Sequence, residues 1–377
     1  MSVVKFSEVA HRANTKEDRF NTDKIYYVGG EHIEPGELFI HDKGFIKGST
    51  IGPMFYCGFK SGQILFVTRN PHLRKCSVAE FDGICSEKTF VIETIDKRIL
   101  LQEYLASVML SDDFWNYCEE NKSGGVNYFL NWSTLADYEF ELPSVEEQKA
   151  ISDKVWAAYR LKESYKKLLA ATEEIVKSQF IEMTGDPRTN PKSWQVKTLS
   201  ELATYSIGLT YKPENISEEG TIVLRSGNIQ NSKIDLADVV RVNCPIKESI
   251  YVQKNDILMC SRNGSAALVG KVAQIKDISE PMTYGAFMTV IRSEYSDFLY
   301  LYFQSNDFRE EVSTGKSSTM NQITQNMLDK ISLPLPDDET RNKLSIILHQ
   351  ADKSKFELRK SIEAIDQVIK SLINDIK

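Results

Sequence analysis

The 377-residue sequence has no apolar run approaching the roughly 18 residues that span a bilayer. Its first twenty residues lack a basic patch followed by an apolar stretch and a small-residue cleavage site, so they do not resemble a secretory signal peptide. The two absences together predict a protein with no membrane segment that stays in the cytoplasm.

Cysteine and histidine are sparse and scattered. The six cysteines form no CxxC pair, and none of the five histidines stands beside them at the spacing of a zinc site. The sequence therefore predicts no metal site.

The signatures of common enzymes are missing as well. Gly315-Lys316-Ser317 resembles the end of a phosphate-binding loop, but Glu310 stands where that loop needs its first glycine. There is no GxSxG, HExxH or GxGxxG pattern, and no Asn/Asp-Pro-Pro-aromatic motif such as amino-methyltransferases place on their target base. We therefore predict a chain that has no catalytic residues, binds no cofactor and is not an enzyme.

An excess of basic residues is also lacking, since the formal net charge is −7. Contact with nucleic acid phosphates normally appears as a basic surface. Net charge hides distribution, however, because cations can gather on one face and a docked partner can add positive charge.

What the sequence does contain is an internal repeat. Phe6–Ala10 recurs as Leu199–Ala203, and Arg69-Asn70 recurs as Arg262-Asn263, both at a displacement of 193 residues. The same displacement relates Leu142-Pro143 to Leu335-Pro336. One spacing held from start to finish predicts two copies of one unit.

Each copy changes periodicity part-way along. Residues 1–143 and 186–336 contain short strand-like runs separated by Gly, Asn, Ser and Pro, which predicts two strand-rich mixed domains. Residues 144–185 and 337–377 instead carry apolar residues at alternating steps of three and four, a heptad pattern that predicts two long helices. Ser144 with Glu147 marks the start of the first helix, and Gly185 marks its end.

The order of these segments predicts the fold class. The first helix leaves domain one and reaches domain two, so the second helix covers the same apolar seam only by running back. We therefore predict an α+β fold in which two similar domains are separated by two antiparallel coiled-coil helices, with pseudo-twofold internal symmetry. The alternative is that each seam packs on its own domain. A rod of about 36 residues is roughly 54 Å long at 1.5 Å per residue, a spacer suited to a split site on DNA.

Several segments resemble type I restriction-modification specificity subunits. These are Leu142–Ile151 at the entry to the first helix, Phe180–Pro187 with Asn190–Trp194 after it, and Arg225–Ile229, Asn255–Leu258, Asn321–Thr324 and Pro334–Pro336 in the second half. The similarity covers nearly the whole chain. Two departures stand out: Thr340-Arg341 replaces Glu147-Gln148 of the first copy, and Val126–Phe129 replaces the Gln-bearing loop of the second.

This resemblance implies a DNA-reading subunit in which each target recognition domain reads one half of a bipartite double-stranded site. It implies assembly with two methyltransferase subunits and, in the restricting complex, with a translocating nuclease. Adenine methylation would then use S-adenosylmethionine bound by the methyltransferase partner. Two alternatives stay open, a non-catalytic coiled-coil scaffold and a stand-alone DNA-modifying enzyme with an unrecognised site.

The candidate DNA contacts are polar residues at strand ends and in loops, where side chains reach a surface. Arg69 and Arg262 suit guanine edges and Asn70 and Asn263 suit adenine edges, although the same dipeptides also fit a turn with a solvated arginine. The remaining candidates are Arg74 and Lys75 for phosphate, Asn127 and Tyr128 in the first domain, and Arg225, Ser226, Asn228, Ser261, Lys316, Ser317, Asn321 and Gln322 in the second.

Overall fold

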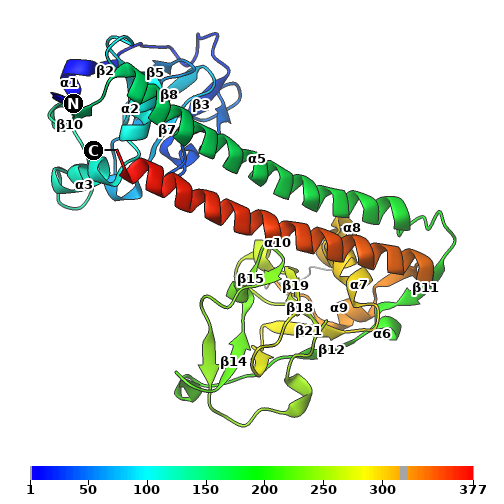
Figure 1. The fold of residues 1–377 in the computed structure, drawn as a ribbon. Helices are drawn as coiled ribbons and strands as arrows, with labels where there is room; N and C mark the ends of the chain where they lie inside the picture. The colour runs from blue at the N-terminus through cyan, green and yellow to red at the C-terminus, as the bar shows by residue number, and fades with distance from the viewer. Residues whose placement is uncertain (1, 315–320, 377) are drawn as a thin grey trace. The chain divides into compact units, whose positions relative to one another are not determined.

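Two long helices, α5 (Val145–Thr184) and α10 (Asp338–Asn374), are the largest elements of the chain. The computed structural model describes residues 2–314 and 321–376. Contacts divide the chain into a first unit, which ends at Leu168 and resumes at Glu357, and a second unit, Leu169–Phe356. Each unit contains one globular head and part of each helix (Figure 1).

The first head contains the elements from β1 to β10. Its main sheet has the order β2-β9-β6-β7, and a second sheet has the order β4-β3-β8-β5. The elements are β1 (Ser2–Lys5), α1 (Phe6–Val9), β2 (Ala10–Ala13), β3 (Tyr26–Val28), β4 (Gly44–Phe45), β5 (Phe55–Phe59), β6 (Ile64–Val67), β7 (Cys76–Val78), β8 (Gly83–Ser86), β9 (Thr89–Thr94), α2 (Gln102–Val108), α3 (Asp112–Glu120), α4 (Trp132–Ala136) and β10 (Glu139–Leu142). Short 3-10 turns cover Gly30–His32 and Pro71–Leu73.

The second head contains the elements from β11 to β22. Its main sheet, β12-β21-β18-β19, has the order of β2-β9-β6-β7 in the first head. The elements are β11 (Gln195–Thr198), α6 (Leu199–Leu202), β12 (Thr204–Ile207), β13 (Ile216–Ser217), β14 (Thr221–Leu224), β15 (Ile229–Gln230), β16 (Lys233–Ile234), β17 (Val240–Val242), β18 (Ile257–Cys260), β19 (Val272–Gln274), β20 (Met282–Tyr284), β21 (Met288–Arg292), α7 (Ser296–Phe303), α8 (Asn306–Thr314), α9 (Gln325–Asp329) and β22 (Ser332–Leu335). Four 3-10 turns cover Pro213–Asn215, Ser226–Asn228, Glu248–Ile250 and Ala266–Leu268.

The repeat extends to strand register. Ser2 pairs with Leu142 in the β1–β10 ribbon, and Gln195 pairs with Leu335 in the β11–β22 ribbon, so the displacement found in the sequence relates both strands of the two ribbons. The second head also has a second sheet, with the order β13-β17-β14-β20. The second sheets of the two heads share a parallel pair, β3–β8 and β14–β20. They differ at one edge, where the first head adds β5 beside β8 and the second adds β13 beside β17. The heads are therefore two versions of one fold, as predicted.

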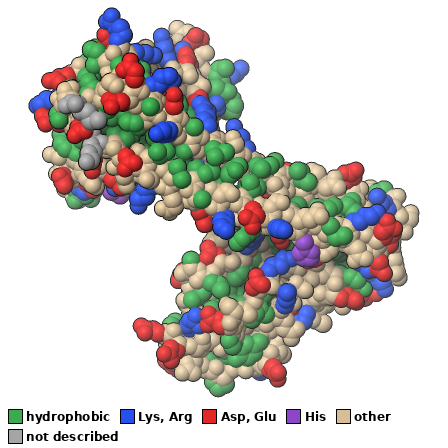
Figure 2. Space-filling view, in the orientation of Figure 1, with side chains coloured by type: hydrophobic (Ala, Val, Ile, Leu, Met, Phe, Trp, Pro, Cys, Tyr) green, Lys and Arg blue, Asp and Glu red, His purple; other side chains and the backbone are tan. Residues whose placement is uncertain are grey.

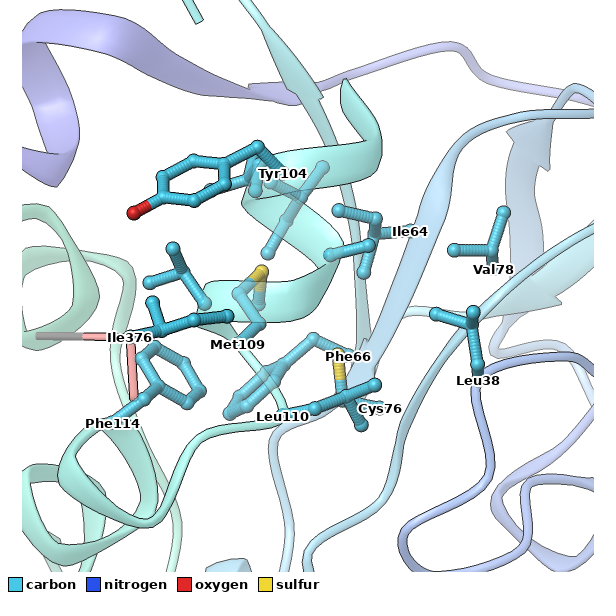
Figure 3. Close-up of a cluster of buried hydrophobic side chains, with 14 of the residues drawn as sticks. Leu38, Ile64, Phe66, Cys76, Val78, Tyr104, Met109, Leu110, Phe114 and Ile376 are labelled. Atoms are coloured by element: carbon cyan, nitrogen blue, oxygen red, sulfur yellow. The ribbon is translucent and has the colours of Figure 1, made fainter. Parts of the chain in front are cut away.

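The core of the first unit joins the sheet, the short helices and the end of α10. Phe66 of β6, Phe114 of α3 and Met109 after α2 are each fully buried, and Ile376 beyond α10 enters the same cluster (Figure 3). Phe66 lies nearly parallel to Trp115, with ring centroids 5.5 Å apart. Burying such large rings is the dominant favourable contribution to the stability of a domain of this size.

The two helices run antiparallel, as predicted. In the first unit Lys162 of α5 pairs with Asp366 of α10. In the second unit Val176 of α5, further along that helix, shares a core cluster with Leu344 and Leu348, which lie earlier along α10. None of the helices in the described ranges, 2–314 and 321–376, is long and apolar enough to cross a membrane.

Apolar residues of both helices also pack on the heads. Ile365, Ile369 and Ile373 of α10 belong to the core cluster of the first head, and Val176 and Phe180 of α5 belong to that of the second. The heptad pattern therefore marks surfaces shared between helix pairing and packing on the heads. Both interpretations that the sequence left open therefore apply. The apolar stripe of each helix is buried partly against the other helix and partly against a head, so it is wider than the narrow seam of a two-helix coiled coil.

Candidate nucleic-acid interface

In the second head, the loop after β18 is linked to residues 321–323. The guanidinium of Arg262 donates from Nε and Nη2 to Oε1 of Gln322, at 3.1 and 2.6 Å. Arg262 is exposed, so this fork is held at the surface in one orientation. Nη1 and the second N–H of Nη2 form the other edge of the guanidinium, and a planar donor pair held in one orientation is suited to bidentate recognition of two acceptors.

Neighbouring amides complete the same cluster. Asn263 donates from Nδ2 to Oγ of Ser226 at 3.1 Å and accepts at Oδ1 from the backbone N–H of Ser265 at 2.9 Å. Asn321 donates from Nδ2 to the carbonyl of Gly264 at 3.2 Å. Four predicted residues from three separate segments, Ser226, Asn263, Asn321 and Gln322, thus lie together with Arg262.

The first head has the same backbone arrangement at the positions that the repeat predicts. Three links correspond between the heads, and each joins the loop after β6 or β18 to a second loop. The first link is Asn70 N–H to Tyr128 O (3.0 Å), matched by Asn263 N–H to Asn321 O (3.3 Å). The second is Leu130 N–H to Thr68 O (3.0 Å), matched by Ile323 N–H to Ser261 O (2.8 Å), and the third is the bridge Arg69–Phe129, matched by Arg262–Gln322. We call this pair of linked loops the recognition frame of each head.

The side chains on the two frames differ. In the first head the guanidinium of Arg69 lies 5.1 Å from the ring centroid of Phe129, and the amine of Lys122 lies 4.4 Å from that of Tyr128. Asn127 beside them is exposed. In the first head, therefore, aromatic rings lie against the cations, whereas in the second head the side chain of Gln322 holds Arg262.

Asn70 adopts the turn conformation that the sequence left as an alternative. Its backbone lies in the left-handed region at φ 53°, which asparagine tolerates better than most residues. It leads directly into the 3-10 turn Pro71–Leu73. The sequence pair Arg-Asn is shared by the heads, but only in the first does asparagine serve this backbone role.

The two phosphate candidates of the first head have partners within the chain. Arg74 donates from Nη1 to Oδ1 of Asp112 at 2.5 Å, a bond that holds the pKa of Asp112 below its ordinary value. Lys75 donates to the carbonyl of Gly30 at 2.5 Å. Both cations therefore stabilise loops of the first head, and a phosphate would have to compete for them.

Three further candidates of the second head also bond internally. Asn228 is buried, accepts at Oδ1 from the N–H of Arg225 at 2.9 Å, and donates to two carbonyls at 2.9 and 2.8 Å. Ser261 is 7% exposed and donates to the carbonyl of Phe287. Arg225 reaches Asp238 at 3.4 Å. An amide that is buried with its bonds satisfied is unsuited to reading a base, so we reassign Asn228 to holding its loop. Lys316 and Ser317 lie outside the described residues.

Comparisons with known proteins find two kinds of similarity, in sequence and in structure. Residues 191–367 match the family described as type I restriction modification DNA specificity domain. Over 193 residues the chain is 30% identical to the type I restriction enzyme EcoKI specificity subunit of Escherichia coli (strain K12), covering 48% of this chain and 40% of that protein. It is 28% identical over 193 residues to the StySPI specificity subunit of Salmonella potsdam, covering 48% and 41%. The chain thus spans about two fifths of the length of the curated relatives it matches.

Solved structures resemble the chain over almost its whole length. The type I restriction-modification S subunit from M. genitalium has a TM-score of 0.60 at 14% identity, covering 99% of this chain and 95% of that one. A structure described under complex assembly and conformational transition of the type I R-M system has a TM-score of 0.57 at 18% identity, covering 99% and 96%. Residues 191–367 thus resemble a type I restriction modification DNA specificity domain, and the likeness to the solved structures shows that the chain shares their fold.

One departure from the specificity-subunit pattern has a structural explanation. In the first copy Gln148 is fully buried and donates to the carbonyl of Pro143 at 3.0 Å. In the second copy Arg341 donates to the carbonyl of Pro336, the counterpart of Pro143 in the repeat. Each long side chain therefore satisfies the same carbonyl at the start of a helix, and the replacement preserves the helix entry.

Sequence reasoning missed the turn that supports each frame. The hydroxyls of Thr68 and Ser261 donate to the carbonyls of Lys88 and Phe287, at 2.8 and 3.0 Å. Thr68 and Ser261 are counterparts in the repeat, so the repeat itself was the available signal. Lys88 and Phe287 could not be matched in this way, because insertions between the main-sheet strands change the displacement.

On the side drawn in Figure 2, Lys and Arg side chains are interspersed with Asp and Glu, so charge marks no basic face on that side. Among the described residues, no group of three or more His, Cys, Asp or Glu is placed to hold a metal ion.

Proposed function

We propose that this chain is the DNA-reading subunit of a type I restriction-modification complex, in which each head reads one half of a bipartite double-stranded site. The observation that carries the proposal is the recognition frame, which recurs in both heads with the same three backbone links. Duplex DNA has its own dyad symmetry, so two similar readers suit a split site with unread bases between its halves.

The side chains on the frames support direct reading of bases. Arginine pairs in a bidentate manner with guanine, and asparagine or glutamine with adenine. Arg262 is exposed and held by Gln322, and Arg69 is held against Phe129. Fixed donors lose little side-chain freedom on binding, which favours specificity.

The partners in this proposal are two methyltransferase subunits and, in the restricting complex, nuclease subunits. Adenine methylation then uses S-adenosylmethionine bound by the methyltransferase, and this chain contributes neither cofactor nor catalytic residue. The cytoplasmic location expected from the sequence belongs to the same proposal. The surfaces of α5 and α10 that do not face the heads are the places where such partners could dock on the shared scaffold.

The test is selection of bound sequences from a randomised DNA duplex library by the full chain. We expect two short conserved half-sites separated by a fixed number of random bases, and affinity that falls steeply with salt. The full chain alone is expected to transfer no methyl group from S-adenosylmethionine to DNA and to cut none. Arg262→Ala should change preference in one half-site by roughly 1 to 3 kcal/mol at one position and leave the other half unchanged.

Other outcomes would favour the alternatives. Absence of any selected sequence and of salt-dependent binding would favour a scaffold with no DNA role. Methyl transfer or cleavage by the rigorously purified chain would favour a stand-alone enzyme.

A further inference from the structure

Phe287 is an exposed aromatic residue in the turn that supports the recognition frame of the second head. It lies between β20 and β21 and is 59% exposed. Its carbonyl accepts three hydrogen bonds, from the N–H and Oγ of Ser261 and the N–H of Arg262, each at 3.0 Å. The turn is closed by the N–H of Met288, which donates to the carbonyl of Gly285 at 2.8 Å. An apolar ring is thus presented to solvent on a rigid backbone.

The ring stands beside the arginine fork. The guanidinium carbon of Arg262 lies 5.9 Å from the ring centroid of Phe287, while the fork itself bonds to Gln322. A single exposed apolar residue is common on protein surfaces and needs no explanation. An exposed ring beside a fixed hydrogen-bond donor is different, because the two together form a surface that can recognise a ligand. In the major groove, a donor fork matches guanine, and the apolar group available there is the 5-methyl of thymine.

We propose that Phe287 recognises the 5-methyl group of a thymine in the half-site of the second head. This inference rests on the proposed DNA-reading function and names a residue that determines specificity within it. The ring and the fork read neighbouring positions on one edge of the duplex, the fork through acceptor atoms and the ring through the methyl group.

The first head lacks this feature. Its matching position is Lys88, whose carbonyl accepts from the N–H and Oγ1 of Thr68 at 2.9 and 2.8 Å, just as Phe287 accepts from Ser261. The amine of Lys88 pairs with Glu87 at 2.7 Å. A charge-paired lysine offers no ring to a methyl group, so we expect thymine reading at this position in the second half-site alone.

The experiment compares thymine with deoxyuridine, which lacks only the methyl group and keeps every hydrogen-bonding atom. Half-sites are first selected from a randomised duplex library with the full chain, and Arg262→Ala identifies the half read by the second head. Each thymine of that half is then replaced by deoxyuridine and the dissociation constant is measured. At one position we expect the affinity to fall roughly fourfold, as expected when one buried methyl-sized group is removed.

Variants of the protein decide whether Phe287 causes that loss. Phe287→Ala should bind thymine and deoxyuridine duplexes equally, and Phe287→Leu should keep part of the discrimination. The matched control is Ile278→Ala, because Ile278 is 41% exposed in the same head but precedes β20, at the opposite end of that strand from Phe287. This control should retain the full fourfold ratio.

The outcomes separate the two proposals. A selected bipartite site whose second half shows no methyl-sensitive thymine, or shows one that Phe287→Ala leaves unchanged, overturns the inference while the DNA-reading function stands. Failure to select any bipartite site overturns the DNA-reading function itself.

Discussion

Replacing Lys162 by methionine should destabilise the first unit, because this lysine is charged and almost enclosed. Its Nζ lies 2.8 Å from Oε1 of Glu37 and 2.7 Å from Oδ1 of Asp366, and the side chains of Lys162 and Glu37 are 10% and 11% exposed. Lys162→Met replaces the four-carbon stem with an unbranched apolar chain of similar length and removes the ammonium group that both carboxylates share. Among the described residues, the buried carboxylate of Glu37 then keeps the ion pair with Lys166, at 2.9 Å.

The magnitude follows from what each carboxylate loses. Removing one partner of a buried ion pair typically costs about 3 to 5 kcal/mol. Asp366 is 45% exposed and can be rehydrated, and Glu37 keeps one partner, so we expect the lower end, about 3 kcal/mol. The matched control is Lys149→Met on the same helix, whose pair with Asp153 is 67% and 65% exposed. That change should cost less than about 0.5 kcal/mol.

Urea unfolding of the full chain measures the difference. Trp194 is the one tryptophan of the second unit, so a Trp194→Phe background restricts the fluorescence signal to the three in the first unit, Trp115, Trp132 and Trp156. Equal losses of unfolding free energy in Lys162→Met and Lys149→Met would refute the reasoning.

The same ion pair predicts a pH dependence. Burial raises the pKa of Glu37, but hydrogen bonds from Lys162 and Lys166 outweigh burial and lower it overall. Burial lowers the pKa of Lys162, but hydrogen bonds to Asp366 and Glu37 raise it overall. The carboxylate therefore contributes stability that is lost as pH falls through its folded pKa, and the lysine contributes stability that is lost as pH rises through its own. The cost of Lys162→Met should be largest between the ordinary values of 4.5 and 10.5.

Three further changes test other parts of the structure. Asp256→Asn should destabilise the second unit by about 3 kcal/mol in urea unfolding followed by Trp194, since Asp256 is 1% exposed and pairs with Arg292 at 2.7 Å; an unchanged midpoint would contradict this. Ile369→Asp should lower the free energy of unfolding by several kcal/mol because it places a carboxylate in the core of the first unit, whereas its exposed neighbour Val368→Asp should change it little. Adding one heptad, about 10 Å, to both α5 and α10 should widen the unread spacer in selected DNA by about 3 base pairs without altering either half-site; an unaltered spacer would show that the helices do not set it.

Local signals allowed the helices to be predicted from the sequence. Ser144 and Glu147 exchange the hydrogen bonds of a capping box, at 3.0 and 3.3 Å, and α5 ends directly before Gly185, which has a positive φ of 73°. Both signals involve residues within a few positions of each other. The surface that covers an apolar stripe is set by distant segments, so the sequence could not show that Ile369 and Phe180 would enter the cores of the heads.

The candidate site could be predicted only in part for the same reason. The constant displacement of the repeat placed Arg69 and Arg262 at matching strand ends, and the matching bridges that these two residues form agree with that placement. The partners of Arg74 and Lys75 lie 38 and 45 positions away, at Asp112 and Gly30. Whether a surface cation is available for phosphate depends on such pairings, and no local pattern reports them.

The two heads also show what the repeat keeps and what it lets vary. Buried Asp256 pairs with Arg292 in the second head, while the matching residues of the first, Gln63 and Glu93, form a hydrogen bond at 2.8 Å. Both partners differ together, because a lone buried charge costs more than either complete pair. At the surface no such constraint applies, and Phe287 faces solvent where Lys88 stands in the first head. Under the proposed function, a frame fixed by backbone bonds with free choice of exposed side chains would allow each half-site to change while the fold and the other half-site stay the same.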